Sequence, residues 1–147
     1  MLAIRMSRPS EASEIIQIWK SSVDATHDFL TASDRQEIKK EVVGFFSETP
    51  VWVATNQADQ PLGFMFLHDG HLEALFVDAS ARGLGVGKRL VSHALELHPD
   101  LSVDVNEQNQ QAVGFYQHMG FQVSGRSERD NQGRPYPLLH LRIANKM

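Results

Sequence analysis

The stretch that decides the fold runs from His71 to Leu95 and reads HLEALFVDASARGLGVGKRLVSHAL. It begins with the apolar run Leu72–Val77, passes through a glycine-rich turn, and continues with apolar residues spaced three or four apart. A strand, a glycine-rich turn and a helix in this order present unpaired backbone N–H groups and the positive end of the helix dipole to an anion. Because Gly83, Gly85 and Gly87 lack Cβ atoms, a phosphate can approach those N–H groups closely. The stretch therefore predicts a phosphate site.

Two common phosphate-binding motifs do not fit this loop. The dinucleotide fingerprint G-x-G-x-x-G requires its third glycine at the position that Lys88 occupies. A Walker loop needs Gly-Lys-Ser/Thr after a spacer of four residues, whereas Gly87 and Lys88 are followed by Arg89. The spacing excludes both classes, and a plain loop with helix-capping glycines is the remaining structural alternative.

Two motifs give the loop a more specific interpretation. The sequence RGLGVG at 82–87 resembles the acyl-CoA signature R/Q-x-x-G-x-G/A of the GNAT superfamily of N-acetyltransferases, and NQQAVGFYQHMGF at 109–121 resembles the second signature of that family. The segment WKSSVDATHDFL at 19–30 further resembles small bacterial members that consist of one domain. The resemblance extends over the full chain and implies an enzyme, an acyltransferase with acetyl-CoA as the donor.

The remaining sequence alternates between strand and helix patterns. Strands are expected at 2–6, 51–55, 62–67, 72–77, 101–105, from 121 to 125 and from 136 to 143. Helices are expected from Pro9 or Ser10 to about Val23, from near Ser33 until Pro50 ends the helix, and at 86–97 and 109–119. The second helix is expected to bury Ile38, Val42, Phe45 and Phe46. Asp69-Gly70 predicts a tight hairpin. The order β-α-α-β-β-β-α-β-α-β-β predicts a mixed α/β, GNAT-like fold in a single domain, 1–147. Its mostly antiparallel sheet should have about seven strands, with four helices on both faces.

Composition limits the classes of function. The 147 residues are 41% hydrophobic and 22% charged, which is ordinary for one globular domain. A net charge of -4 disfavours nucleic acid as the main partner. The chain has no cysteine, which excludes disulfides and a cysteine nucleophile, and its histidines lack the spacing of a metal site, so no metal is expected. No signal peptide or long apolar run is visible, so we expect a cytoplasmic protein with no membrane partner.

The resemblance implies which residues contact acetyl-CoA. The amides and charges expected at the pyrophosphate belong to Arg82, Gly83, Leu84, Gly85, Val86, Gly87 and Lys88, with Arg89 as either a further charge partner or a solvated helix residue. Backbone groups of Leu75, Phe76 and Val77 would pair with the pantetheine arm as an added strand does, and one amide there would polarise the thioester carbonyl. In the second signature the expected contacts are Asn109, Ala112, Phe115 and Tyr116, although Asn109 also suits a helix N-cap.

The same resemblance suggests catalytic roles. Tyr116 matches the tyrosine that acts as general acid toward the departing sulfur. Two roles fit Asn106 equally well. It forms a hydrogen bond to the thioester or to an ordered water, or it is a plain turn residue. Glu73 is the expected base, acting through water, with His27 and His71 as rivals because neutral imidazole is available near pH 7. The lack of cysteine favours direct transfer in a ternary complex over a thiol acyl-enzyme.

The acceptor pocket is expected near the end of the first helix. Its expected residues are Trp19, Thr26, His27, Phe29, Phe64, His71 and Tyr136, although core packing is the preferred interpretation of Trp19. Few carboxylates are obvious in this set, which argues against a polycation such as an aminoglycoside. A small amine, an amino acid, a peptide N-terminus or a lysine all fit.

Two other functions use the same fold. A non-catalytic acyl-CoA-binding sensor or interaction module needs the glycine loop but not Tyr116 or Asn106. A toxin-like enzyme that acetylates aminoacyl-tRNA should carry a basic face, which the acidic composition disfavours. The sequence leaves a monomer and a homodimer equally open.

Overall fold

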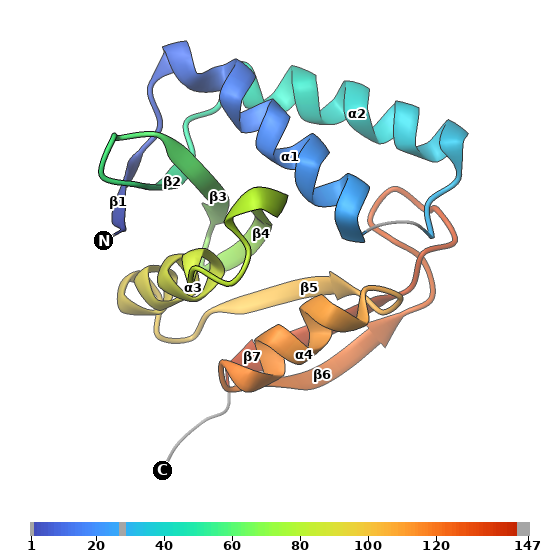
Figure 1. Cartoon of the computed structure of the whole chain (residues 1–147). Coiled ribbons are helices and arrows are strands. Elements are labelled where there is room, and N and C mark those ends of the chain that lie inside the picture. Colours follow the sequence, from blue (N-terminus) through green and yellow to red (C-terminus); the bar gives the residue numbers. More distant parts are fainter. Residues whose placement is uncertain (1, 27–28, 144–147) are drawn as a thin grey trace. The chain divides into compact units, whose positions relative to one another are not determined.

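A computed structural model of the chain describes residues 2–26 and 29–143 (Figure 1). Its elements are β1 (Ala3–Met6), the 3₁₀ turn η1 (Pro9–Glu11), α1 (Ala12–Thr26), α2 (Ala32–Phe46), β2 (Trp52–Thr55), β3 (Pro61–His68), β4 (His71–Val77), the 3₁₀ turn η2 (Ala79–Ala81), α3 (Val86–Leu97), β5 (Ser102–Asn106), α4 (Gln110–His118), β6 (Phe121–Ser127) and β7 (Leu138–Ile143). The predicted order of helices and strands is confirmed. The larger differences are at five boundaries. Helix α1 begins at Ala12, after the 3₁₀ turn, and continues past Val23 to Thr26, and α2 ends at Phe46, before Pro50. Strand β6 continues to Ser127, and the last strand begins at Leu138 rather than at Tyr136.

The strands form a mixed sheet in the order β1-β2-β3-β4-β5-β7-β6. The pairs β1–β2, β2–β3, β5–β7 and β6–β7 are antiparallel, and β4–β5 is parallel. The predicted hairpin before β4 is present, since Asp69 and Gly70 have φ values of 50° and 76°, as a two-residue turn with two left-handed residues requires. The prediction of a mostly antiparallel sheet of about seven strands is therefore confirmed.

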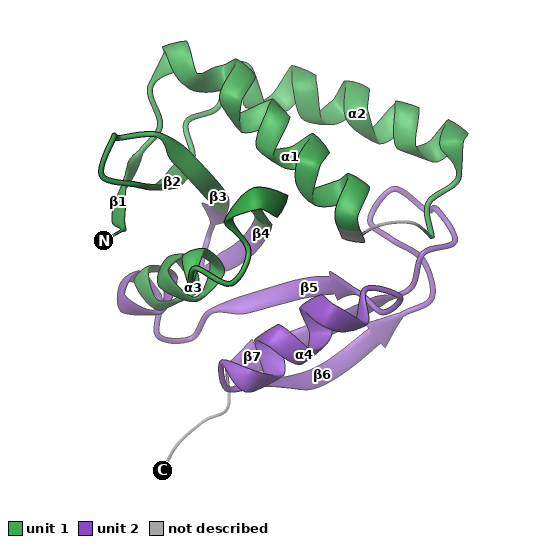
Figure 2. Ribbon diagram, in the orientation of Figure 1, with its two compact units in different colours: residues 1–66, 74–93 green, residues 67–73, 94–147 purple. Residues whose placement is uncertain are grey.

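The chain divides into two compact units (Figure 2): residues 1–66 and 74–93 form one, which we call unit 1, and residues 67–73 and 94–147 form the other, unit 2. In unit 1, α1 and α2 lie side by side (Figure 1) and cover one face of the strands. Their shared core contains Ile15, Ile18, Trp19, Val23, Phe46, Val51, Val53 and Phe64. One expectation was wrong: Phe45 is 43% exposed, because only Phe46 of this pair turns fully toward the core.

Helix α3 begins on the other face of β3, and a missing side chain allows it. A Cβ added to Gly63 would lie 2.7 Å from Cγ1 of Val86 and 3.5 Å from Cδ1 of Leu90. Phe64, the next residue, points to the opposite face and contacts Phe46 at 5.1 Å between ring centroids. Because successive strand residues alternate between faces, β3 separates the layer of α1 and α2 from the start of α3. Unit 1 thus has helices on both faces of its strands, as predicted.

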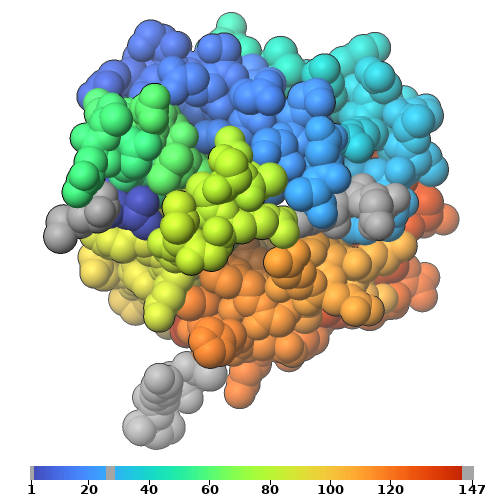
Figure 3. Space-filling view, viewed as in Figure 1, coloured from blue at the N-terminus to red at the C-terminus, as the bar shows by residue number. Residues whose placement is uncertain are grey.

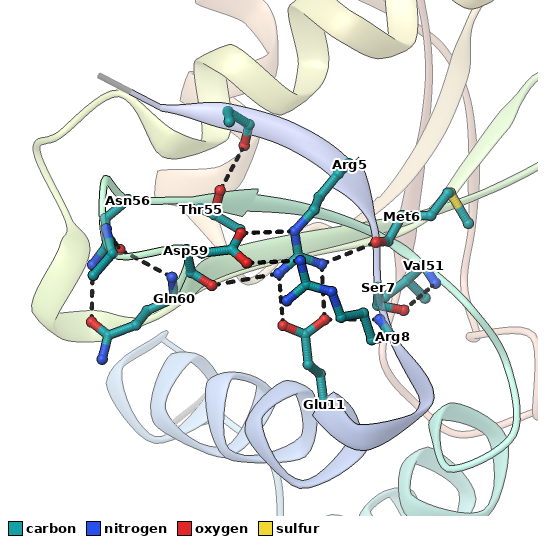
Figure 4. Close-up of polar contacts among 12 residues, drawn as sticks. Arg5, Met6, Ser7, Arg8, Glu11, Val51, Thr55, Asn56, Asp59 and Gln60 are labelled. Atoms are coloured by element: carbon teal, nitrogen blue, oxygen red, sulfur yellow. Dashed lines mark hydrogen bonds and ion pairs between the residues drawn. The ribbon is translucent and has the colours of Figure 1, made fainter.

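A charged network joins β1, η1 and the β2–β3 loop (Figure 4). The guanidinium of Arg5 donates to both carboxylate oxygens of Glu11, at 2.9 and 2.7 Å, and to Asp59 at 3.0 Å. Arg8 also pairs with Asp59, at 2.8 Å. Glu11 is only 5% exposed, so this paired carboxylate lies inside the structure. The hydrogen bonds from Arg5 lower the pKa of Glu11, and those from Arg5 and then Arg8 lower the pKa of Asp59.

In unit 2, α4 packs against β5 and β6. Its residue Tyr116 contacts Phe121 at 5.6 Å between ring centroids, and Phe121 pairs with Ile143. Val103 and Leu141 pair with each other on the same face and are buried. The opposite face of β5 carries the polar residues of this strand, Ser102, Asp104 and Asn106.

Candidate active site

The glycine loop of unit 1 has the backbone that an anion site needs. Gly83 and Gly85 have φ values of 80° and 78°, and a Cβ at either position would meet no atom within 4 Å. The first recurring helix bond runs from the amide of Arg89 to the carbonyl of Gly85, at 2.9 Å, so the amides of the preceding turn have no intrahelical partner. Residues 82–85 and Lys88 are exposed, and Figure 3 shows this loop at the surface. The geometry fits a pyrophosphate.

The loop is fixed at its start by Asp78, whose carboxylate accepts from the amide and the hydroxyl of Ser80, at 2.9 and 2.8 Å. These bonds, that of the amide first, lower the pKa of Asp78. Ser21 of α1 joins the same cluster, since its hydroxyl accepts from the amide of Ala79 at 2.9 Å and lies 3.3 Å from the Asp78 carboxylate. Ser21 thereby ties the end of β4 to α1, a role that the sequence did not reveal.

Gly63 is the second positioning residue that the sequence analysis missed. The buried side chain of Val86 fills the space where a Cβ at Gly63 would stand, so the first turn of α3 lies directly on β3. A glycine inside an apolar strand is a known sign of such a close approach, and it was the available signal.

Strand β4 pairs with β5 over a short length. The parallel register joins His71 to Ser102 and Leu72 to Val103, and within unit 2 it does not continue to Glu73 and Asp104. The expected pantetheine contacts Leu75, Phe76 and Val77 follow on β4 and are half-buried.

The second signature forms the start of α4. Asn109 is the helix N-cap: its side chain accepts from the amide of Ala112 at 3.2 Å. The amide of Asn109 in turn donates to the carbonyl of Asn106 at 3.0 Å, which fixes the turn after β5. Asn109 therefore has the capping role, one of its two predicted roles.

Tyr116 is 6% exposed, and its ring contacts Phe115 at 5.2 Å and Phe121 at 5.6 Å between centroids. Burial raises the pKa of the phenol well above its usual range. The phenol therefore stays protonated at neutral pH and is available as a donor. Among the hydrogen bonds of the described residues, none involves its hydroxyl.

Three residues predicted to take part in catalysis, Asn106, Glu73 and His71, share the polar face of unit 2. Asn106 lies two residues after Asp104 on β5, and Glu73 lies two residues after His71 on β4, so each pair points to one face. Glu73 is exposed while Leu72 is buried, which agrees with the preference for Glu73 outside the core. Glu73 and Asp104 also place two carboxylates here, more than the sequence led us to expect.

Asp104 itself was missed, together with His140. The carboxylate of Asp104 lies 2.7 Å from Nδ1 of His140 and 3.4 Å from Nε2 of His71. The available signals were the alternation in β5, which sets Ser102 and Asp104 against Val103, and the single imidazole in the apolar run of β7.

The residues expected around the acceptor are divided between the two units. Trp19 and Phe64 are 3% and 0% exposed in the core of unit 1, so they serve packing here and are not presented to an acceptor. Phe29 is half-buried in unit 1, and Tyr136 is buried in the segment before β7 in unit 2. His27 lies outside the described residues, as does the side chain of Thr26.

The described residues show neither the ligand cluster of a metal site nor a membrane-spanning helix. Between 2–26 and 29–143, no three His, Cys, Asp or Glu residues are arranged to hold a metal ion. In the same part of the chain, no helix combines the length and the apolar character needed to cross a membrane.

Comparison with known proteins agrees with both signatures. The family description "Acetyltransferase (GNAT) domain" matches residues 16–137. Peptidyl-lysine N-acetyltransferase YjaB of Escherichia coli (strain K12) is 55% identical over 141 residues, 96% of this chain and 96% of that protein. Peptidyl-lysine N-acetyltransferase YiaC of the same organism is 32% identical over 82% of this chain and 83% of that protein. The solution structure of apo-form YjaB from Escherichia coli superposes with a TM-score of 0.94, with 53% identity and 99% of both chains covered.

Proposed function

The chain belongs to the GNAT family of N-acetyltransferases, and from this membership we propose that it transfers an acetyl group from acetyl-CoA to lysine side chains of proteins or peptides. The observation that carries the donor part is the pair of left-handed glycines, Gly83 and Gly85, at the start of α3. The acceptor part rests on the relatives, two of which are named peptidyl-lysine N-acetyltransferases at 55% and 32% identity.

Acetyl-CoA supplies the activated acyl group. In unit 1, the amides of residues 83–88 bind the pyrophosphate, and Arg82 and Lys88 add positive charge. The backbone of Leu75–Val77 pairs with the pantetheine arm. In unit 2, Asn106 orients the thioester or an ordered water. Support comes from the exposed loop.

Tyr116 donates the proton to the departing sulfur. The thiol has an ordinary pKa near ~8.5, below that of a phenol, so the transfer is uphill in water. Burial raises the pKa of Tyr116 further. Because the departing thiolate enters the same dry surroundings, the pKa of the thiol is raised as well. The buried phenol therefore contributes a positioned donor where water is excluded.

Direct transfer in a ternary complex is the simplest route for this chain. A chain without cysteine has no thiol to carry the acyl group between donor and acceptor. The two carboxylates on the polar face, Glu73 and Asp104, and the net charge of -4 both favour approach of a cationic lysine. That the chain forms one acetyltransferase domain also remains our proposal, supported by a family match that spans residues from both units.

The test incubates the purified protein with acetyl-CoA and a panel of lysine peptides, small amines and peptides whose only amine is the N-terminus. We expect release of free coenzyme A thiol that depends on the lysine peptide, and a peptide mass increased by one acetyl group. Binding of acetyl-CoA without thiol release on any amine would instead favour the non-catalytic binding module. Thiol release on N-terminal amines alone would contradict the lysine assignment.

A further inference from the structure

Asp104 lies between two imidazoles, and each imidazole reaches a serine on its far side. The hydroxyl of Ser127 is 2.7 Å from Nε2 of His140, whose Nδ1 is 2.7 Å from Oδ1 of Asp104. The other oxygen of Asp104 is 3.4 Å from Nε2 of His71, whose Nδ1 is 2.7 Å from the hydroxyl of Ser102. All five residues belong to unit 2, on four adjacent strands.

The chemistry of a carboxylate decides which nitrogens carry hydrogen. An ionised carboxylate can only accept, so the imidazole nitrogens that face Asp104 must be the N–H donors. In neutral imidazole the other nitrogen then has a free lone pair, and each serine hydroxyl donates to it. His140 is thus held by Asp104 with Nε2 as its basic atom, in the arrangement by which a carboxylate orients a catalytic histidine.

The register places this cluster beside Asn106. Leu138 pairs with Asn106 on β5 and with Ser127 on β6, so Ser127 and Asn106 are at the same level of the sheet. Asp104 and His140 pair directly with each other, two residues along the strands from the pair of Asn106 and Leu138. Tyr116 packs on the opposite face with Phe121. A group that takes a proton and a group that gives one are therefore available on the two faces of the same strands.

We propose that His140, oriented by Asp104, accepts the proton of the acceptor ammonium through the hydroxyl of Ser127. This inference rests on the proposed function. A lysine amine has a pKa near ~10.4 and is almost entirely protonated at neutral pH, so a base is needed before it can attack. Imidazole near ~6.5 is the side chain suited to that task. Asp104 and His71 are positioning residues: Asp104 fixes the tautomer, and His71 holds its second oxygen.

One ammonium proton passes to the oxygen of Ser127 while the hydroxyl proton moves to Nε2 of His140, and the imidazolium later returns it to water. The neutral nitrogen forms the N–C bond as the C–S bond breaks. Tyr116 gives its proton to sulfur and regains one, through water, from the excess proton left on nitrogen.

Charged and titratable groups face His140 from three strands. Asp104 faces it from β5, and His71 and Glu73 lie on the same face of β4. From β6 it meets Gly125, whose Cβ would lie 3.4 Å from the ring, and Ser127. Arg142, two residues further on β7, is the cation on this face. His140 is 35% exposed and Asp104 24%, so water can reach the pair.

The test compares two acceptors that differ only in basicity: a lysine peptide, and the same peptide with sulfur in place of the lysine γ-methylene, whose amine is less basic. Thiol release is followed for His140→Gln, Asp104→Asn and Ser127→Ala from pH 6 to 10, with His118→Gln on the exposed end of α4 as the matched control. For His140→Gln and Asp104→Asn we expect kcat on lysine at pH 7 to fall roughly a hundredfold. The loss should shrink with the less basic amine and at high pH, while the affinity for coenzyme A is unchanged. His118→Gln should behave as the unmodified protein.

The outcomes separate the inference from the proposed function. If the unmodified protein acetylates no lysine peptide, the proposed function fails. If it does and His140→Gln keeps full kcat, or if the loss is equal for both amines at every pH, the inference is overturned, because a purely structural role would not depend on acceptor basicity. An acetyl group found on Ser127 after exposure to acetyl-CoA alone would also overturn it. Should His140→Gln not fold, Asp104→Asn and the nitrogen NMR signals of His140, expected to show hydrogen on Nδ1, decide.

Discussion

Gly63 and Val86 meet so closely that a single methyl group would not fit between them: a Cβ on Gly63 would lie 2.7 Å from Cγ1 of Val86 and 3.0 Å from the carbonyl oxygen of Phe76. The first turn of α3, which carries the expected pyrophosphate amides, therefore rests on the bare backbone of β3. Packing inside unit 1 and the position of the donor loop depend on the same contact.

Gly63→Ala should accordingly impair both stability and donor binding. We expect the free energy of unfolding to fall by about 1–3 kcal/mol, the usual cost of overpacking, because the Phe76 carbonyl is backbone and cannot turn away. Urea unfolding and calorimetric binding of coenzyme A measure the two effects. The matched control is Gly44→Ala in the exposed part of α2, where a Cβ meets nothing within 4 Å; there we expect a gain of about 0.5–1 kcal/mol. Unchanged coenzyme A binding in a folded Gly63→Ala would contradict the link to the loop.

Gly85→Ala tests the loop backbone itself. At a φ of 78° an alanine costs about 1–2 kcal/mol, and relief of that strain turns the amides away from the anion. We expect the affinity for coenzyme A to fall about tenfold, which corresponds to 1.4 kcal/mol. Gly133→Ala is the control, since Gly133 has the same φ of 78° and the same empty surroundings in unit 2. Equal losses of affinity in the two variants would show that the loop has no special role.

Tyr116→Phe should separate binding from turnover. The ring contacts with Phe115 and Phe121 remain in the variant, so the melting temperature and the affinity for acetyl-CoA should hardly change. Loss of the phenolic proton should lower kcat by roughly a hundredfold, the size expected for a general acid. Stopped-flow or steady-state thiol release measures it. A kcat within twofold of the unmodified protein would remove Tyr116 from the reaction.

The Arg5–Glu11 pair should make stability depend on acid pH (Figure 4). Its hydrogen bonds lower the pKa of Glu11 in the folded state, so the stabilisation is fully present above the unfolded value near ~4.3 and is lost as pH falls through the lowered folded value. Glu11→Gln should cost about 2 kcal/mol at pH 7, as for a buried charge-assisted hydrogen bond. The difference between the two proteins should shrink below about pH 4.

Urea unfolding at pH 7 and at successively lower pH measures that difference. Glu48→Gln, an exposed carboxylate after α2, is the comparison and should be nearly neutral throughout. A constant difference between Glu11→Gln and the unmodified protein at all pH values would mean that the pair does not titrate as described.

Much of the fold could be predicted because its signals are local. Asp69-Gly70 specifies a tight turn by its backbone preference alone, and both residues have the positive φ that the turn needs. Asn109 caps α4 for an equally local reason, with an acceptor placed before an unpaired amide. Burial was harder to predict. Phe45 and Phe46 are neighbours of equal hydrophobicity, and only the packing of α2 on the strands decided that Phe46 is covered and Phe45 is 43% exposed.

The site divides in the same way. Residues 82–88 and 109–121, which include Tyr116, could be proposed from the sequence because each motif consists of residues close together along the chain. Phe64 was expected at the acceptor, and for Trp19 core packing was the preferred of two interpretations; both residues lie in the core, since an aromatic residue suits either environment until its neighbours are known. The family match over residues 16–137 includes both motifs. A contiguous signature can therefore be recognised without any knowledge of the packing.

The sequence by itself determined the order of elements, the class of enzyme and the donor loop, because each depends on residues close together along the chain. Only the tertiary structure revealed the contact of Gly63 with Val86 and the cluster of Asp104 with His71 and His140. Those residues come from strands far apart in the chain and meet through the sheet register, and no local pattern encodes which strands will be neighbours. The proposed donor loop could therefore be recognised from the sequence alone. The candidate base could be recognised only from the order of the strands β4, β5, β7 and β6 in the sheet.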